Sequence, residues 1–159
     1  MKIKGLTDED FVNYKLPSMY ICTSVCGFKC DKESGENCCQ NSSLAAQQTL
    51  NVEDSLIIER YINNPITKAI CFAGLEPLDQ FDELLAFIKK FRVHYHRNDT
   101  IVIYTGYNKS EVSYQISELM RFNNIVMKYG RFVPNQQKHF DDVLGVYLAS
   151  DNQFAEVLC

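Results

Sequence analysis

The cysteines of this chain are crowded into one short stretch. Five of the seven fall between Cys22 and Asn41, in the sequence CTSVCGFKCDKESGENCCQN. The stretch follows a short apolar run, Met19 to Ile21, and it is itself polar and interrupted by Gly27 and Gly35. Such a segment does not suit a buried strand or helix. We therefore expect a ligand-binding loop that hangs from the end of a strand.

The composition limits the class of protein. With 159 residues, of which 46% are hydrophobic, the chain can form one domain with a buried core. A net charge of −4 gives no reason to expect nucleic acid or an anionic membrane as a partner. The N-terminus lacks the apolar segment of a signal peptide, and no apolar run approaches the roughly 18 residues of a membrane span. We expect a single domain, residues 1–159, in the cytoplasm.

A cytoplasmic location affects which chemistry is expected of the cysteines. Disulfides rarely persist in the cytoplasm, and seven cysteines cannot form a complete disulfide framework. A cysteine cluster in a reducing compartment is more often a metal or catalytic site. Cys71 lies within an apolar run and Cys159 is terminal, so we look for ligands within the crowded stretch.

Apolar runs and helical periodicity alternate along the rest of the chain. Strands are expected over residues 18–23, 67–73, 100–105, 125–128 and 144–149. Helices are expected from an Asn51 cap to Pro65 with Leu56, Ile57 and Tyr61 on the apolar face, from Leu78 to Phe91, and from Ser110 to Phe122. The first 17 residues are polar and are expected to wrap the edge of the domain, and residues 130–142 are expected to form a long polar loop.

This order predicts the fold class. Strands that alternate with helices indicate an α/β fold with a mostly parallel sheet and right-handed crossovers. Ligands bind such sheets beyond the carboxyl ends of the strands. The cysteine stretch, Gly74–Glu76, Tyr104–Gly106 and Ser150–Asn152 each lie at or just after the end of an expected strand. We expect these four segments to form one ligand site.

Several sets of cysteines can act as ligands. Three thiolates hold an iron–sulfur cluster with one iron left open. Cys26 and Cys30 have the spacing Cys-x3-Cys, and so do Cys22 and Cys26. Cys38 and Cys39 are adjacent, so we expect one of them not to bind. Zinc held by Cys22, Cys26, Cys30 and Cys39 is the alternative, because zinc takes four ligands at similar spacing.

The cysteine stretch resembles that of radical S-adenosylmethionine (SAM) enzymes, and more narrowly that of the activating proteins of anaerobic ribonucleotide reductase. That family has Cys-x3-Cys-x2-Cys followed by an aromatic residue and Asn. The best match takes Cys26, Cys30 and Cys39 as ligands, because Cys39-Gln40-Asn41 resembles the family's Cys-Tyr-Asn. The family's two-residue gap has become eight residues, Asp31 to Cys38. The alternative set of ligands, Cys22, Cys26 and Cys30, is not followed by an Asn at the position where the family has one.

Four later segments resemble the family in the same order. They are Phe72–Leu78, Ile103–Tyr107, Tyr129–Phe132 and Ser150–Gln153. The first differs by carrying Leu75 where the family has a second glycine. The resemblance implies a partial (β/α) barrel that binds a 4Fe-4S cluster and SAM. It implies that the residues in contact with SAM are Asn41, Gly74, Glu76, Thr105, Gly106 and Asn152.

The resemblance also implies an activity. A radical SAM oxidoreductase cleaves SAM reductively to a 5′-deoxyadenosyl radical, with no catalytic residue beyond the cluster. The radical would install a glycyl radical on a partner such as the large subunit of anaerobic ribonucleotide reductase, and an external donor would supply the electron. The alternative is a non-catalytic module that binds zinc or an iron–sulfur cluster on the same scaffold.

Overall fold

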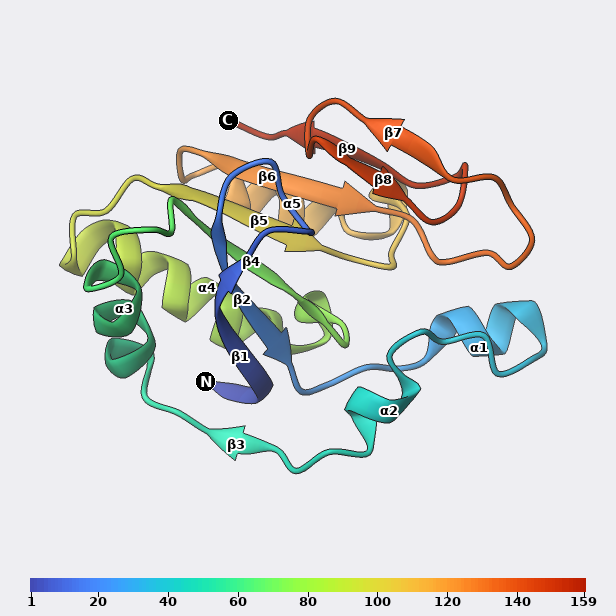
Figure 1. Cartoon of the computed structure of the whole chain (residues 1–159), viewed down its shortest axis with the longest axis horizontal. Helices are drawn as coiled ribbons and strands as arrows, with labels where there is room; N and C mark the ends of the chain where they lie inside the picture. The colour runs from blue at the N-terminus through green and yellow to red at the C-terminus, as the bar shows by residue number, and fades with distance from the viewer.

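One seven-stranded sheet organises the molecule, shown in Figure 1 as a computed structural model that describes residues 1–159. Its strand order is β3-β1-β2-β4-β5-β6-β9. The strands are β1 Lys2–Asp10, β2 Ser18–Thr23, β3 Leu50–Asn51, β4 Ala69–Gly74, β5 Thr100–Tyr104, β6 Ile125–Tyr129 and β9 Phe154–Val157. The four central strands, β2, β4, β5 and β6, are parallel.

The expected mostly parallel sheet of a partial barrel is wrong. The sheet is mixed, since β1 pairs antiparallel with both β2 and β3, and β9 pairs antiparallel with β6. Antiparallel strands therefore border the parallel set on both sides, so no further β/α unit can extend it. The sequence did not reveal β1 because it has few apolar residues, or β9 because it is only four residues long, and both strands are partly exposed.

Five α-helices form: α1 Lys29–Ser34, α2 Ser42–Ala45, α3 Asp54–Ile62, α4 Phe81–Lys89 and α5 Ser113–Leu119. The last three follow the expected order with shifted ends, whereas α1 lies in the cysteine stretch, which was expected to be a loop. A 3-10 turn over Pro77–Gln80 leads into α4, and a second over Lys109–Glu111 precedes α5. No helix of the chain is both long enough and apolar enough to cross a membrane.

Two details of the expected elements are corrected. Asn51 lies in β3, and Glu53 is the residue that precedes α3. Leu56 is exposed, whereas Ile57 and Tyr61 pack into the core. Leu56 precedes Ile57 by one position, about 100° around the helix, so packing decides which of the two is buried. The expected strand over residues 144–149 forms part of a separate hairpin, β7 His139–Asp141 with β8 Val146–Leu148.

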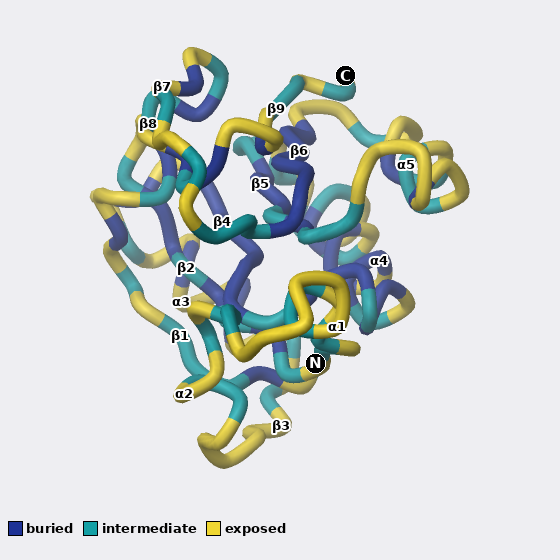
Figure 2. The backbone as a smooth tube through the Cα atoms, turned by 90° about the vertical axis from the view of Figure 1, so that its right-hand side faces the viewer, coloured by how far each residue is buried: buried dark blue, intermediate teal, exposed yellow.

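The two faces of the sheet are covered differently. Helices α3, α4 and α5 pack on one face, where large side chains such as Phe72, Phe87 and Ile103 form the main core. The other face carries smaller residues, including Ala69 and Cys71, under the β7–β8 hairpin. Figure 2 shows the central strands buried, with α1 and the turns around it exposed. The cysteine stretch thus lies outside the core.

Candidate functional site

A cavity lies where the cysteine stretch meets the strand ends. Five segments of the chain line it. These are Cys26–Cys30, Cys39 with Asn41, Gly74–Glu76 with Asp79, Gly106–Tyr107, and Arg131–Phe132. Parallel pairing explains the arrangement, because Thr23 at the end of β2 pairs with Gly74 at the end of β4. The cysteine stretch therefore begins beside the strand ends that complete the cavity.

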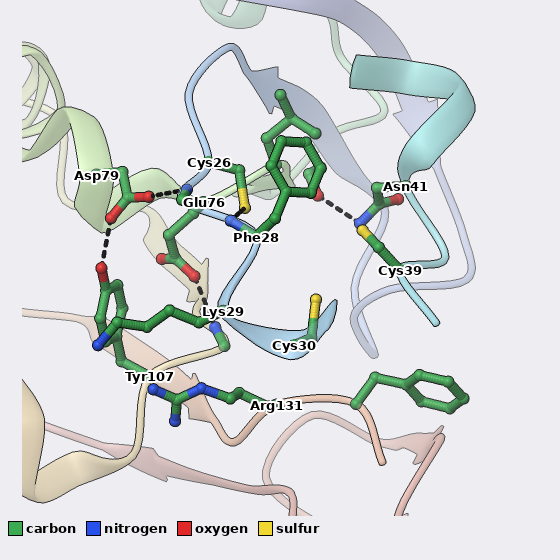
Figure 3. A pocket seen from close by; sticks show the side chains of 15 residues that line it. Cys26, Phe28, Lys29, Cys30, Cys39, Asn41, Glu76, Asp79, Tyr107 and Arg131 are labelled. Carbon is green, nitrogen blue, oxygen red and sulfur yellow. Dashed lines mark hydrogen bonds between the residues drawn. The ribbon is translucent and has the colours of Figure 1, made fainter. Parts of the chain in front are cut away.

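Three thiols face this cavity. Figure 3 shows Cys26, Cys30 and Cys39 around the same opening, and all three are half-buried. Burial raises the pKa of Cys26 to about 11, although its sulfur accepts a hydrogen bond from the Phe28 N–H at 3.2 Å. Burial also raises the pKa of Cys30, and the neighbouring Cys39 adds to that shift. A metal that binds here must therefore displace protons from the thiols.

The eight residues between Cys30 and Cys39 fold back on themselves. Six-residue α1 ends at Gly35, which adopts a left-handed φ of 75° and donates its N–H to the Asp31 carbonyl at 3.0 Å. The Oδ1 atom of Asp31 accepts the N–H groups of Cys38 at 2.9 Å and of Cys39 at 2.8 Å. The long gap thus still returns Cys39 to the cavity that Cys30 lines.

At the end of β4, the backbone of Gly74 lies in close contact with β2 and with the cysteine stretch. Gly74 has a φ of 84°, and a Cβ atom on it would lie 2.9 Å from the Cα and Cβ of Cys22. Only glycine fits there without movement of β2. The Asn41 side-chain amide donates to the Gly74 carbonyl, which attaches the cysteine stretch to β4. Cys22 lies behind this contact and does not line the cavity.

Glu76 is a buried carboxyl group in the cavity wall. Its Oε1 accepts the Thr105 hydroxyl at 2.8 Å and the Leu78 N–H at 3.1 Å, and its Oε2 accepts the Gly106 N–H at 2.8 Å. Burial nevertheless raises the pKa of Glu76 to about 7. A cationic group in the cavity would lower that pKa and favour the carboxylate.

The remaining candidate residues lie further from the cavity. Thr105 is buried and does not line the cavity, but its hydroxyl donates to Glu76 and accepts the Tyr107 N–H, and both of these residues do line it. Asn152 does not line the cavity. Its side-chain amide donates to the Arg131 carbonyl at 2.9 Å, so it supports the turn that carries Arg131. The structure thus brings seven of the nine candidates to the cavity lining, all except Thr105 and Asn152.

Charged residues that the sequence analysis did not single out complete the lining. Asp79 accepts the Gly27 N–H and the Tyr107 hydroxyl, both at 2.6 Å. Lys29 lies over the Tyr107 ring, with its Nζ 4.6 Å from the ring centre. Asp79 follows Glu76 by three residues at the start of a helical segment. That spacing places both side chains on one side and was the available signal for Asp79.

An ion-pair network joins the two sides of the cavity. Arg131 donates two hydrogen bonds of 2.7 Å to Glu111, which also pairs with Lys29 at 3.2 Å. Arg131 contacts Glu33 of α1 at 3.1 Å as well. The hydrogen bond with Arg131 lowers the pKa of Glu111 to about 2. The network ties the cysteine stretch to the turns that follow β5 and β6.

Comparison with known proteins agrees with a cluster site. Residues 18–153 match the family described as "4Fe-4S single cluster domain". This range contains all of the cavity-lining residues. No curated protein and no solved structure shows a significant match to the chain.

Proposed function

Because the chain belongs to the 4Fe-4S single cluster domain family, we propose that Cys26, Cys30 and Cys39 hold the cluster. Their shared position around one cavity supports this assignment. Three thiolates leave one iron of a 4Fe-4S cluster open to a further ligand. The Phe28 N–H that reaches the Cys26 sulfur supplies the kind of hydrogen bond that tunes a cluster.

We propose further that SAM occupies the rest of the cavity. The observation that carries this proposal is that the three thiols share their cavity with the polar strand ends of β4 and β5. The lining holds the carboxyl groups of Glu76 and Asp79 and the cations of Lys29 and Arg131. Groups of both charges suit the ammonium and carboxylate of an amino acid such as the methionine part of SAM.

Each lining group has a role in this proposal. Glu76 accepts a hydrogen bond from the SAM ammonium, which holds it as the carboxylate despite its burial. Gly74 and Gly106 allow the ligand to approach the backbone closely. Asp79 fixes both Gly27 and Tyr107, so it holds the thiol side of the cavity against the strand side.

The proposed chemistry needs one electron. A reduced 4Fe-4S cluster held by these residues would supply one electron for cleavage of a carbon–sulfur bond of SAM to methionine and a 5′-deoxyadenosyl radical. The protein contributes orientation and exclusion of water around the bound SAM. An external reductant restores the electron after each turnover.

We propose that the radical acceptor comes from a partner polypeptide. The chain of 159 residues leaves little sequence to build a separate pocket for a bulky second substrate, so the acceptor would arrive as a loop of a partner. The resemblance to reductase activating proteins points to a glycine of a glycyl-radical enzyme, such as anaerobic ribonucleotide reductase. Loss of a hydrogen atom from its Cα would give 5′-deoxyadenosine and a glycyl radical.

The direct test begins with protein reconstituted anaerobically with iron and sulfide. We expect about four irons per chain and, after reduction with dithionite in the presence of SAM, release of methionine and 5′-deoxyadenosine. Cys26→Ser should abolish both the cluster and the products, whereas Cys159→Ser should change neither. A fully loaded and reduced protein that never consumes SAM would refute the SAM proposal and leave the non-catalytic cluster-binding module.

A separate experiment tests the partner. Reduced protein, SAM and a candidate reductase subunit are mixed without oxygen, and electron paramagnetic resonance detects any glycyl radical. The expected doublet should disappear when the acceptor glycine is replaced by alanine. Products of SAM cleavage without a radical on any such partner would refute the acceptor and retain the cleavage reaction.

A further inference from the structure

A second group of metal ligands lies beside the cavity. The Cys30 thiol, a carboxylate oxygen of Asp31 and the Cys38 thiol all lie within 4.8 Å of one another. No other three His, Cys, Asp or Glu side chains of the chain come together so closely. Asp31 and Cys38 do not line the cavity that contains Cys26 and Cys39. Cys30 therefore belongs to two different arrangements of ligands.

The spacing of the ligand atoms separates the two arrangements. Cys26, Cys30 and Cys39 do not all lie within 4.8 Å of one another, so they do not form a group as compact as this one. Two thiolates of one zinc ion lie at most about 4.6 Å apart, twice the Zn–S distance. The Cys30, Asp31 and Cys38 group is already close to this limit. All three residues lie in an exposed turn and α1, where a small shift costs little packing.

The contacts around the group leave its ligand atoms oriented and available. Asp31 uses Oδ1 to accept two backbone N–H groups, so Oδ2 remains free for a metal ion. The Ser34 hydroxyl donates to the Cys38 sulfur at 3.3 Å. The ion pairs of this segment use Lys29 and Glu33, so no cation neutralises Asp31. Partners of this kind orient metal ligands in known sites.

From this geometry we propose that Cys30, Asp31 and Cys38 bind a single thiophilic divalent cation such as Zn²⁺. Two thiolates and a carboxylate supply three ligands, and water supplies the fourth. Because Cys30 cannot serve both sites, this ion and the cluster are mutually exclusive. The proposal gives Cys38, which the cavity leaves aside, a function of its own. It does not depend on the chemistry of SAM.

The first test uses Co²⁺, which reports tetrahedral thiolate ligands by its absorption. Apo-protein kept without oxygen should bind one Co²⁺ with thiolate-to-cobalt charge transfer. Cys38→Ser should weaken that binding at least about tenfold, since even loss of an outer partner costs about 10- to 100-fold. Cys26→Ser should bind Co²⁺ as the wild type does. Equal affinity in Cys38→Ser and wild type, or a greater loss in Cys26→Ser, would overturn the proposal.

The second test needs no variant and so does not depend on folding of a mutant. Zn²⁺ should slow alkylation of Cys30 and Cys38 by iodoacetamide relative to Cys26, as mapped by mass spectrometry. Preferential protection of Cys26 and Cys39 would place the ion in the cavity and overturn the proposal.

The third test measures competition. Zn²⁺ added before iron and sulfide should lower the yield of cluster in wild-type protein and should lower it much less in Cys38→Ser. Circular dichroism of Cys38→Ser verifies the fold, and Cys159→Ser serves as the matched control. Equal inhibition by Zn²⁺ in wild type and Cys38→Ser would show that the ion competes through other residues.

Discussion

The two sides of the cavity are built in opposite ways. On the strand side, Glu76 and Thr105 are buried and hydrogen-bonded to one another at the ends of β4 and β5. On the thiol side, α1 contains no buried residue, and its position depends on turns, on Asp31 and on ion pairs. The ligand groups on the strand side are therefore preorganised by the core. Those on the thiol side depend on local contacts and on any metal bound.

This contrast suits a site that must acquire its metal after folding. The strand side can fold without the metal because its polar groups already have partners within the protein. The thiol side retains protonated, half-buried thiols that a metal converts to ligands. Four experiments test the contrast. The first is expected to remove the metal, and the three that follow are ordered by the expected loss of unfolding free energy.

Replacing one cysteine on the thiol side and one in the central sheet should have different effects. The first should remove the cluster, and the second should lower the stability of the fold. Cys39→Ser is expected to lose most cluster iron with little change in thermal midpoint, because Cys39 lies outside the core. Cys71→Ser buries a hydroxyl in the middle of β4 and should cost roughly 1–3 kcal/mol of unfolding free energy while the cluster is retained. Iron analysis and urea denaturation measure the two outcomes. A destabilised Cys39→Ser protein that keeps its iron, or a stable Cys71→Ser protein that loses it, would contradict the proposed difference between the two sides.

Two glycines with similar backbone angles should respond very differently to alanine. Gly74 has a φ of 84° and a Cβ would collide with β2, whereas Gly35 has a φ of 75° and open space around it. We expect Gly74→Ala to lower the unfolding free energy by roughly 3 kcal/mol or more. Gly35→Ala should cost only about 1 kcal/mol, from backbone strain alone. Urea denaturation of both apo-proteins gives the comparison, and equal losses would refute it.

The buried carboxyl group should make stability depend on pH. The pKa of Glu76 is raised to about 7 in the folded protein, so between its unfolded value of 4.5 and 7 the folded state holds more protons. The unfolding free energy should therefore fall as pH rises through that window. Glu76→Gln removes this component, on the order of 3 kcal/mol. Parallel stability curves for wild type and Glu76→Gln from pH 4 to 8 would contradict this expectation.

The smallest effect is expected for the ion pairs that join the two sides. Glu111→Gln removes the partner of both Lys29 and Arg131 and should cost about 1 kcal/mol or less, with a salt-sensitive loss. Hydrogen exchange should nevertheless speed up in α1. Glu118→Gln, which removes a surface pair within and just after α5, is the matched control and should leave α1 unchanged. Equal exchange of α1 in both variants would show that the network does not hold the thiol side.

Much of the site was accessible from the sequence because its parts follow strands. The buried runs of β2, β4, β5 and β6 are almost continuously apolar, and their carboxyl ends had to meet once the strands were parallel. That reasoning placed the cysteine stretch, Gly74, Glu76 and Gly106 together. It also assigned Asn152 to the site, although its amide instead supports the Arg131 turn. Chain order does not specify which side of a turn a side chain occupies.

The sequence by itself determined the order of the central β/α units and the identity of the thiol-bearing segment. These follow from apolar periodicity and residue chemistry, which are local properties. Only the tertiary structure decided that β1 and β9 border the sheet in antiparallel pairing, since partly exposed strands gain their pairing from distant segments. It also decided that Asp31 folds the long gap back, which brings Cys39 to the cavity and Cys38 to the second ligand group.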